Sequence, residues 1–184
     1  MVAIFDVATD FGGSLDTPAS VDIVATNLRF KDADDNTQDL NNPIVIPAAG
    51  NVLSRWKHVF LKCTTAPDTQ VNNVKVYTTT DPFPTGVSLL LGTETPTKTD
   101  AVTTGYDPSN VSDEAMTNHA DITGSAVIPT TSGGAKSVSI TEAGNIIDLA
   151  GETCDYVVMQ LQVASTATQG TMPVETIRFL YDEI

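Results

Sequence analysis

Basic residues are scarce in this sequence: its 184 residues include 9 Lys and Arg against 23 Asp and Glu, a formal net charge of −14. Proteins that bind nucleic acid rely on clustered Lys and Arg to contact phosphates. The 9 basic residues here are scattered along the chain and form no such cluster. An anionic membrane surface is disfavoured for the same electrostatic reason. We therefore expect neither nucleic acid nor a membrane among the partners.

Cysteine, export signals and long apolar runs are also lacking. The two cysteines, Cys63 and Cys154, form no Cys-x-x-Cys pair. Residues 1–6 have neither the positive charge nor the apolar run of a signal peptide. No stretch approaches the roughly 18 apolar residues of a membrane-spanning helix. We therefore expect a chain that is not exported, with two buried free thiols favoured over one disulfide.

The residues that are abundant favour an all-β fold. Hydrophobic residues make up 41% of the chain and charged residues 17%, and the mean hydropathy is zero, which is typical of a folded domain rather than a disordered one. Thr and Val are frequent, whereas Glu, Lys and Arg, which usually coat helices, are few. The length fits one domain with a closed core.

Strand-like segments recur along the chain, separated by turn residues. The predicted strands are 21–30, 43–47, 52–64, 71–79, 87–91, 137–141, 146–149, 154–165 and 175–181. The 52–64 strand carries apolar residues on both faces, so we expect it to be central and covered on both sides. About eight to ten strands with long connections predict one antiparallel β-sandwich over residues 1–184, of jelly-roll or Greek-key type. The predicted core consists of Val59, Leu61, Val74, Val76, Val157, Met159, Leu161, Ile177 and Phe179. In the 154–165 strand, Gln160 and Gln162 are expected to face solvent.

Two segments have less certain places in such a sandwich. Residues 92–134 are rich in Thr, Gly, Ser, Asp and Pro, with one helix-compatible stretch at 112–121. We interpret this region as an extended loop excursion that contacts neighbouring subunits, and without which the sandwich still folds. The apolar residues 1–5 are interpreted as the first strand of the chain's own sandwich, with an arm that adds a strand to a neighbour as the alternative.

One acidic stretch has metal-ligand spacing. Asp32, Asp34 and Asn36 occupy the first, third and fifth positions of an oxygen-ligand calcium loop. An EF-hand, however, needs Gly where Thr37 stands and a bidentate Glu where Pro43 stands. We therefore favour an acidic, solvated turn, leave a calcium site of another type as the alternative, and predict no metal or cofactor.

Residues suited to catalysis do not assemble into a known motif. His58 lies beside Trp56 in a predicted central strand, where a packed imidazole and a core indole are expected. His119 precedes Asp121 by two residues, but a hydrolase also needs an activated nucleophile. Paired glycosidase carboxylates are not identifiable, because the Asp residues lie mostly in predicted turns. We predict no catalytic residues and no enzymatic activity.

Several stretches carry a resemblance to a known group of proteins. They are NLRFKDAD at 27–34, the block 56–77, YVVMQLQV at 156–163 and ETIRFLYDE at 175–183. The residue pattern of these strand-like stretches, which cover most of the chain outside 92–134, resembles that of the virion structural β-sandwich proteins that tailed viruses encode near their capsid genes. The resemblance implies a non-catalytic component of the virion that decorates or cements the outer capsid. A neck, collar or fibre component is the alternative within the same group.

The partners that the resemblance implies are the major capsid protein or neighbouring virion proteins, and a homotrimer is the implied free state. A net charge of −14 is compatible with this, because it favours solubility and complements basic patches on a shell. Two other classes remain open from the residues: a carbohydrate-binding module, and a hydrolase built on His119 and Asp121.

Overall fold

The computed structural model describes residues 2–37, 43–79, 83–94, 98–99, 103, 106–109, 111, 113–118, 122–170 and 175–184. Within these residues the fold is all-β, with three short 3-10 turns and no α-helix. The strands are β1 (Ile4–Phe11), β2 (Ser20–Val24), β3 (Asn51–Leu53), β4 (Lys57–Thr65), β5 (Val71–Thr78), β6 (Val87–Glu94), β7 (Ile122–Val127), β8 (Lys136–Ser137), β9 (Val157–Ala164) and β10 (Ile177–Glu183). The 3-10 turns are η1 (Met116–Asn118), η2 (Ser132–Gly134) and η3 (Ala143–Asn145).

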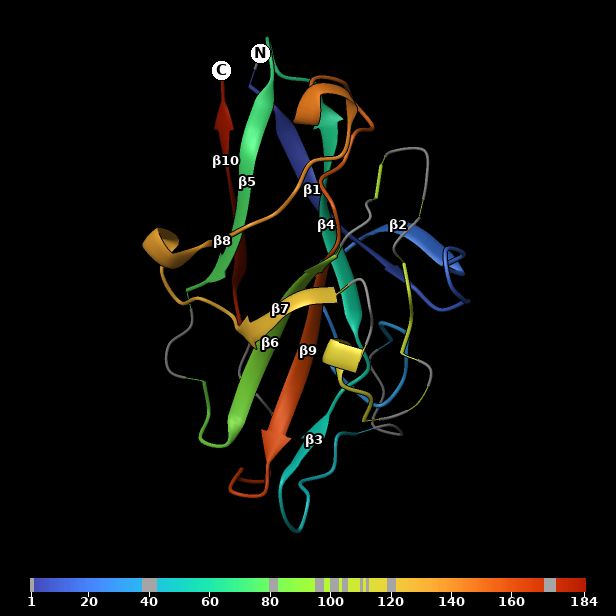
Figure 1. The fold of residues 1–184 in the computed structure, drawn as a ribbon, viewed down its shortest axis with the longest axis vertical. Helices are drawn as coiled ribbons and strands as arrows, with labels where there is room; N and C mark the ends of the chain where they lie inside the picture. Colours follow the sequence, from blue (N-terminus) through green and yellow to red (C-terminus); the bar gives the residue numbers. More distant parts are fainter. Residues whose placement is uncertain are drawn as a thin grey trace.

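The strands form two antiparallel sheets that pack together as a β-sandwich, which confirms the predicted fold class (Figure 1). The larger sheet has seven strands: six follow the order β2-β1-β4-β9-β6-β7, and the seventh, β3, pairs with β9. The smaller sheet has the order β10-β5-β8. Strand β6 pairs along one edge of β9, while β4 and then β3 pair along its other edge. The chain ends lie together at one end of the molecule (Figure 1).

The main core lies between the two sheets, and its composition confirms most of the predicted set. Seven of the nine predicted core residues are buried, and the other two, Ile177 and Phe179 of the edge strand β10, are half-buried against the core. Strand β4 is central and its residues 57–61 are all buried, as expected for a strand covered on both faces. The two thiols, Cys63 and Cys154, are buried and free, as predicted.

A second apolar cluster covers the outer face of the larger sheet. It contains Trp56, Met116, Ile122 and Val158. Because Val158 alternates with core residues along β9, it faces away from the main core. The residues around η1 therefore shield this outer face, and the indole of Trp56 is a buried packing residue, as predicted.

The region 92–134 is more integrated than the predicted excursion. It contributes β7, which pairs with β6, as well as the fully buried side chains of Lys98, Tyr106 and Met116. Within the described part of the predicted helical stretch 112–121, the only helical element is the 3-10 turn η1. A chain without residues 93–131 would lose these buried groups, so we expect this deletion to destabilise the sandwich. Residues 2–3 lead into β1 and residues 4–5 begin it, so this segment belongs to the chain's own sheet. This was the favoured interpretation of residues 1–5.

Several predicted strands are shorter than expected because other hydrogen bonds compete. Strand β2 ends at Val24 instead of Phe30, and the Arg29 N–H binds the side chain of Asn36 at 2.8 Å instead of a neighbouring strand. The described residues 43–47 form no strand, consistent with prolines at both ends that cannot donate to a ladder. The 52–64 strand is divided into β3 and β4.

The carboxyl-terminal half of the sandwich also differs in detail. Residues 137–141 contribute only the end of β8, and 146–149 contribute one isolated bridge, from Ile147 to Val71. The side chain of Gln160, expected to face solvent, is fully buried. Its amide nitrogen donates to the carbonyl oxygens of Ser54 (2.8 Å) and Glu114 (2.6 Å), which fastens the residues before η1 to the sheet.

Candidate functional site

The acidic turn that carries the calcium-like spacing is organised around a buried lysine. The ammonium of Lys57, from the start of β4, donates to the carbonyl oxygens of Ala33 (3.2 Å) and Asp35 (2.8 Å) and lies 4.0 Å from the Asp34 carboxylate. The Lys57 side chain is 1% exposed. An ammonium therefore stands among the oxygen atoms that a calcium ion would use.

Two further basic side chains neutralise the same turn. Lys31 lies 2.6 Å from Asp35, and Arg55 lies 3.6 Å from Asp32. The carboxylates of Asp32 and Asp35 are 44% and 38% exposed, so the acidic turn is in contact with solvent and is also paired with Lys and Arg. Within the described residues no group of three or more His, Cys, Asp or Glu is arranged to hold a metal ion.

Burial changes the acid–base behaviour of Lys57. Desolvation of the ammonium lowers the pKa of Lys57 to about 8, although Asp34 and Asp35 oppose this shift. The unfolded chain keeps the ordinary value near 10.5, so between these two pH values the unfolded state binds more protons. This group therefore makes the free energy of unfolding rise with pH over that interval.

We expect a Lys57→Met variant to lose this contribution. The difference in unfolding free energy, wild type minus variant, should become more positive as the pH rises from about 8 towards 10.5, and change little just below that range. Urea unfolding at a series of pH values measures the difference directly. A difference that is flat or falls over the interval would contradict the assigned burial.

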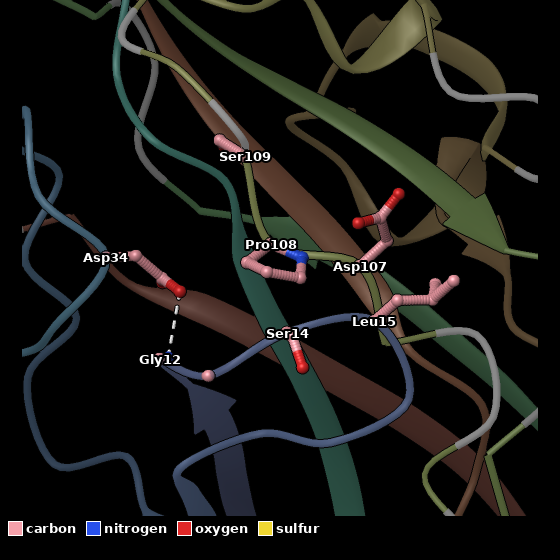
Figure 2. A pocket seen from close by; sticks show the side chains of 8 residues that line it. Gly12, Ser14, Leu15, Asp34, Asp107, Pro108 and Ser109 are labelled. Atoms are coloured by element: carbon pink, nitrogen blue, oxygen red, sulfur yellow. Dashed lines mark hydrogen bonds between the residues drawn. The ribbon is translucent and has the colours of Figure 1, made fainter.

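A cleft of about 570 Å³ opens beside this turn. Figure 2 shows Asp34 on one side and Asp107 on the other. The cleft is lined by Gly12, Gly13, Ser14, Leu15, Asp34, Asp107, Pro108 and Ser109. Its lining contains no His, Cys or Lys, and its titratable side chains are the carboxylates of Asp34 and Asp107.

The polar groups of the cleft hold the structure together. Asp34 accepts the Gly12 N–H at 2.8 Å, drawn as the dashed line in Figure 2. The Tyr106 hydroxyl lies 3.1 Å from the same Asp34 carboxylate. The Ser109 hydroxyl accepts the backbone N–H of Trp56 at 2.8 Å. Gly13 has φ +82°, and a Cβ there would lie 2.1 Å from the Thr17 carbonyl oxygen, so only glycine fits this turn.

Beneath the cleft lies a group of charged side chains that we call the buried ionic cluster, comprising Asp10, Asp22, Lys62 and Lys98. Lys98 lies 3.5 Å from Asp10 and 3.4 Å from Asp22, and Lys62 lies 2.8 Å from Asp22. The side chains of Asp10 and Lys98 are 0% and 1% exposed. Two positive and two negative charges thus balance one another, with Asp10 and Lys98 fully buried and Asp22 and Lys62 partly exposed.

Aromatic rings surround this cluster. The Lys98 ammonium lies 4.4 Å from the Phe60 ring centroid and 5.5 Å from that of Tyr156, and the Tyr156 hydroxyl donates to Asp10. His58 packs against Tyr106 and Tyr156, with ring centroids 4.7 and 5.2 Å apart. The expectation of a packed imidazole at His58 is confirmed.

The sequence analysis missed this cluster because its members lie far apart in the chain. Asp10, Asp22 and Lys62 lie in strands β1, β2 and β4. Lys98 lies in a polar region that was expected to be exposed. The only local signal is a charged residue within a strand pattern, as at Asp10. His119 and Asp121, the other candidates for chemistry, lie outside the described residues.

No family model matches the chain, no curated protein matches it, and no solved structure matches it. Among the described residues no helix is long and apolar enough to cross a membrane. Function therefore has to be argued from the surface and the interior of the sandwich.

Proposed function

We propose that this chain is a non-enzymatic virion structural protein that decorates or cements the outer capsid by binding shell subunits. The observation that best supports the proposal is the exposed edge strand β2, together with the strand texture that resembles virion β-sandwich proteins. A protein of this kind needs a stable body and a surface that pairs with a neighbour, and it needs no active site.

Strand β2 ends the larger sheet, and within the described residues it pairs only with β1. It presents apolar side chains to solvent: Val21 is 45%, Ile23 45% and Val24 51% exposed. An unpaired apolar strand edge favours addition of a strand from another chain, in which backbone hydrogen bonds supply affinity. We infer that this edge, defined here as Val21, Ile23 and Val24, contacts the shell.

Charge supports the same partner. With a net charge of −14, the chain is attracted to basic patches and repelled by other acidic surfaces. Association that depends on such charges weakens as salt screens them. A basic shell surface therefore fits better than an acidic one, and binding to it should fall as ionic strength rises.

Co-sedimentation with shells assembled from the major capsid protein of the same genome tests the proposal. The wild-type chain should sediment with the shells, and Ile23→Lys should weaken binding by about tenfold or more, equivalent to roughly 1.4 kcal/mol. Leu149→Lys is the matched control, because Leu149 is 61% exposed but lies outside the β2 edge. Absence of sedimentation, or equal losses in both variants, would refute the proposed contact.

The other expectations are ranked by what supports them. A neck, collar or fibre position uses the same edge strand and differs only in the neighbour that is bound. The carbohydrate-binding alternative has less support, because Trp56, the only tryptophan, is 1% exposed and offers no sugar-stacking surface. The homotrimer is proposed on the resemblance, and light scattering on the purified chain tests it.

A further inference from the structure

Lys98 and Asp10 meet in a buried site on the outer face of the larger sheet, in an arrangement suited to covalent chemistry. Their side chains are 1% and 0% exposed, and the Lys98 nitrogen lies 3.5 Å from Oδ2 of Asp10. The ring of Phe60 lies beside the nitrogen, 4.4 Å away at its centroid. Bulk water, which would compete with an amine for a carboxyl group, has no access to this pair.

We propose that Lys98 and Asp10 join spontaneously through an intramolecular amide bond between the Lys98 side-chain nitrogen and the Asp10 side-chain carboxyl carbon. The product is an isopeptide bond that fastens the segment containing Lys98 to the end of β1. No cofactor, metal ion or second protein takes part.

The atoms balance without any other reactant. An ammonium nitrogen with three hydrogens and a carboxylate give an amide nitrogen with one hydrogen and one molecule of water. The Lys98 nitrogen loses two protons, attacks the carboxyl carbon of Asp10, and forms the C–N bond as the bond from that carbon to Oδ2 breaks. The departing Oδ2 takes both protons and leaves as water.

The two oxygen atoms of Asp10 are held in ways that suit these roles. Oδ1 accepts the backbone N–H of Asp22 at 2.6 Å, and this donor stabilises the negative charge that develops on Oδ1 in the tetrahedral intermediate. Oδ2 accepts the Tyr156 hydroxyl and faces Lys98. The carboxyl group is therefore oriented on both sides before reaction, which favours attack.

Asp22 is positioned to move the protons. Its Oδ1 is buried and lies 3.4 Å from the Lys98 nitrogen, while its Oδ2 is held by Lys62 at 2.8 Å. Burial raises the pKa of Asp22, but the hydrogen bond from Lys62 and the charges of Lys98 and Lys62 bring it below its ordinary value. Asp22 is thus ionised, and can take a proton from Lys98 and pass it to the leaving oxygen.

The energetics of burial favour the product. A buried ion pair pays a desolvation cost that its mutual attraction only partly offsets. Amide formation converts the Lys98–Asp10 pair into a neutral group and releases water from an apolar site. Lys62 then remains to balance Asp22, so the site stays neutral after the reaction.

Mass spectrometry of the denatured full-length chain tests the proposal. The wild-type chain should be lighter than its sequence by one water molecule, and proteolysis should yield a branched peptide that joins Asp10 to Lys98. Lys98→Arg, which keeps the positive charge, should have its full sequence mass. Lys75→Arg, the same substitution on β5 and away from the cluster, should still lose one water.

A time course on freshly refolded protein tests the role of Asp22. The Asp22→Asn chain should lose water about 100-fold more slowly than the wild type, because general acid–base catalysis contributes at least this factor. A wild-type chain at full sequence mass would overturn the proposal, whether or not the variants fold. So would a branch at a carboxyl group other than that of Asp10. Equal rates in wild type and Asp22→Asn would overturn the role of Asp22.

Discussion

Replacing Asp10 with alanine is expected to reduce the free energy of unfolding by about 3–5 kcal/mol, because it leaves the buried nitrogen of Lys98 as a free ammonium without one of its two carboxylate partners. The Lys98 ammonium, 1% exposed, then keeps only one described carboxylate partner, Asp22, 3.4 Å away. It also removes the acceptor of the Tyr156 hydroxyl and of the Asp22 N–H. Buried polar groups without partners each add to the cost.

Urea unfolding followed by circular dichroism measures this loss. Asp6→Ala is the matched control, because Asp6 lies on the same strand and is only half-buried, outside the buried ionic cluster. The Asp6→Ala substitution should change the free energy of unfolding by about 0.5 kcal/mol, which is typical of substitutions away from buried features. If the two variants unfold at the same urea concentration, the cluster does not stabilise the sandwich as described.

Replacing Trp56 with alanine is also expected to reduce the free energy of unfolding by about 3–5 kcal/mol, because it opens a large cavity in a packed cluster. Trp56 is 1% exposed and packs with Met116, Ile122 and Val158. Its indole nitrogen donates to the Glu114 carbonyl oxygen at 2.9 Å. The variant therefore loses both packing and a hydrogen bond that fastens the residues before η1.

A Trp56→Phe variant separates the two effects. It keeps most of the packing volume and removes the indole N–H. Its free energy of unfolding should therefore fall clearly less than that of the alanine variant. Unfolding in urea, followed by far-ultraviolet circular dichroism, compares the three chains. Wild-type stability in Trp56→Ala would mean that the residues around η1 do not cover the sheet, and that 92–134 is an excursion after all.

The strands that could be predicted are those whose pattern is set by burial alone. Strands β5 and β9 carry apolar residues at regular spacing, and the structure places them close to the predicted 71–79 and 154–165. The prediction was wrong at Gln160, because a polar side chain in a strand pattern indicates a solvent-facing position. Its burial depends on carbonyl oxygens of Ser54 and Glu114 that only the folded chain brings near it.

The buried charges could not be predicted for a related reason. The sequence places Lys57 next to Trp56 in an apolar strand, but its oxygen partners come from the turn at Ala33 and Asp35. Lys98 lies among Thr and Pro residues, a composition that indicates an exposed loop. Pairing between distant residues is a property of the tertiary fold, and local hydrophobic periodicity carries no information about it.

Imaging the intact particle encoded by the genome that carries this chain tests its proposed role most directly. The account predicts density for an all-β domain on the outside of the shell, with the β2 edge (Val21, Ile23 and Val24) against a neighbouring subunit. Particles that lack the chain, or that carry it with the β2 edge facing solvent, would contradict the account.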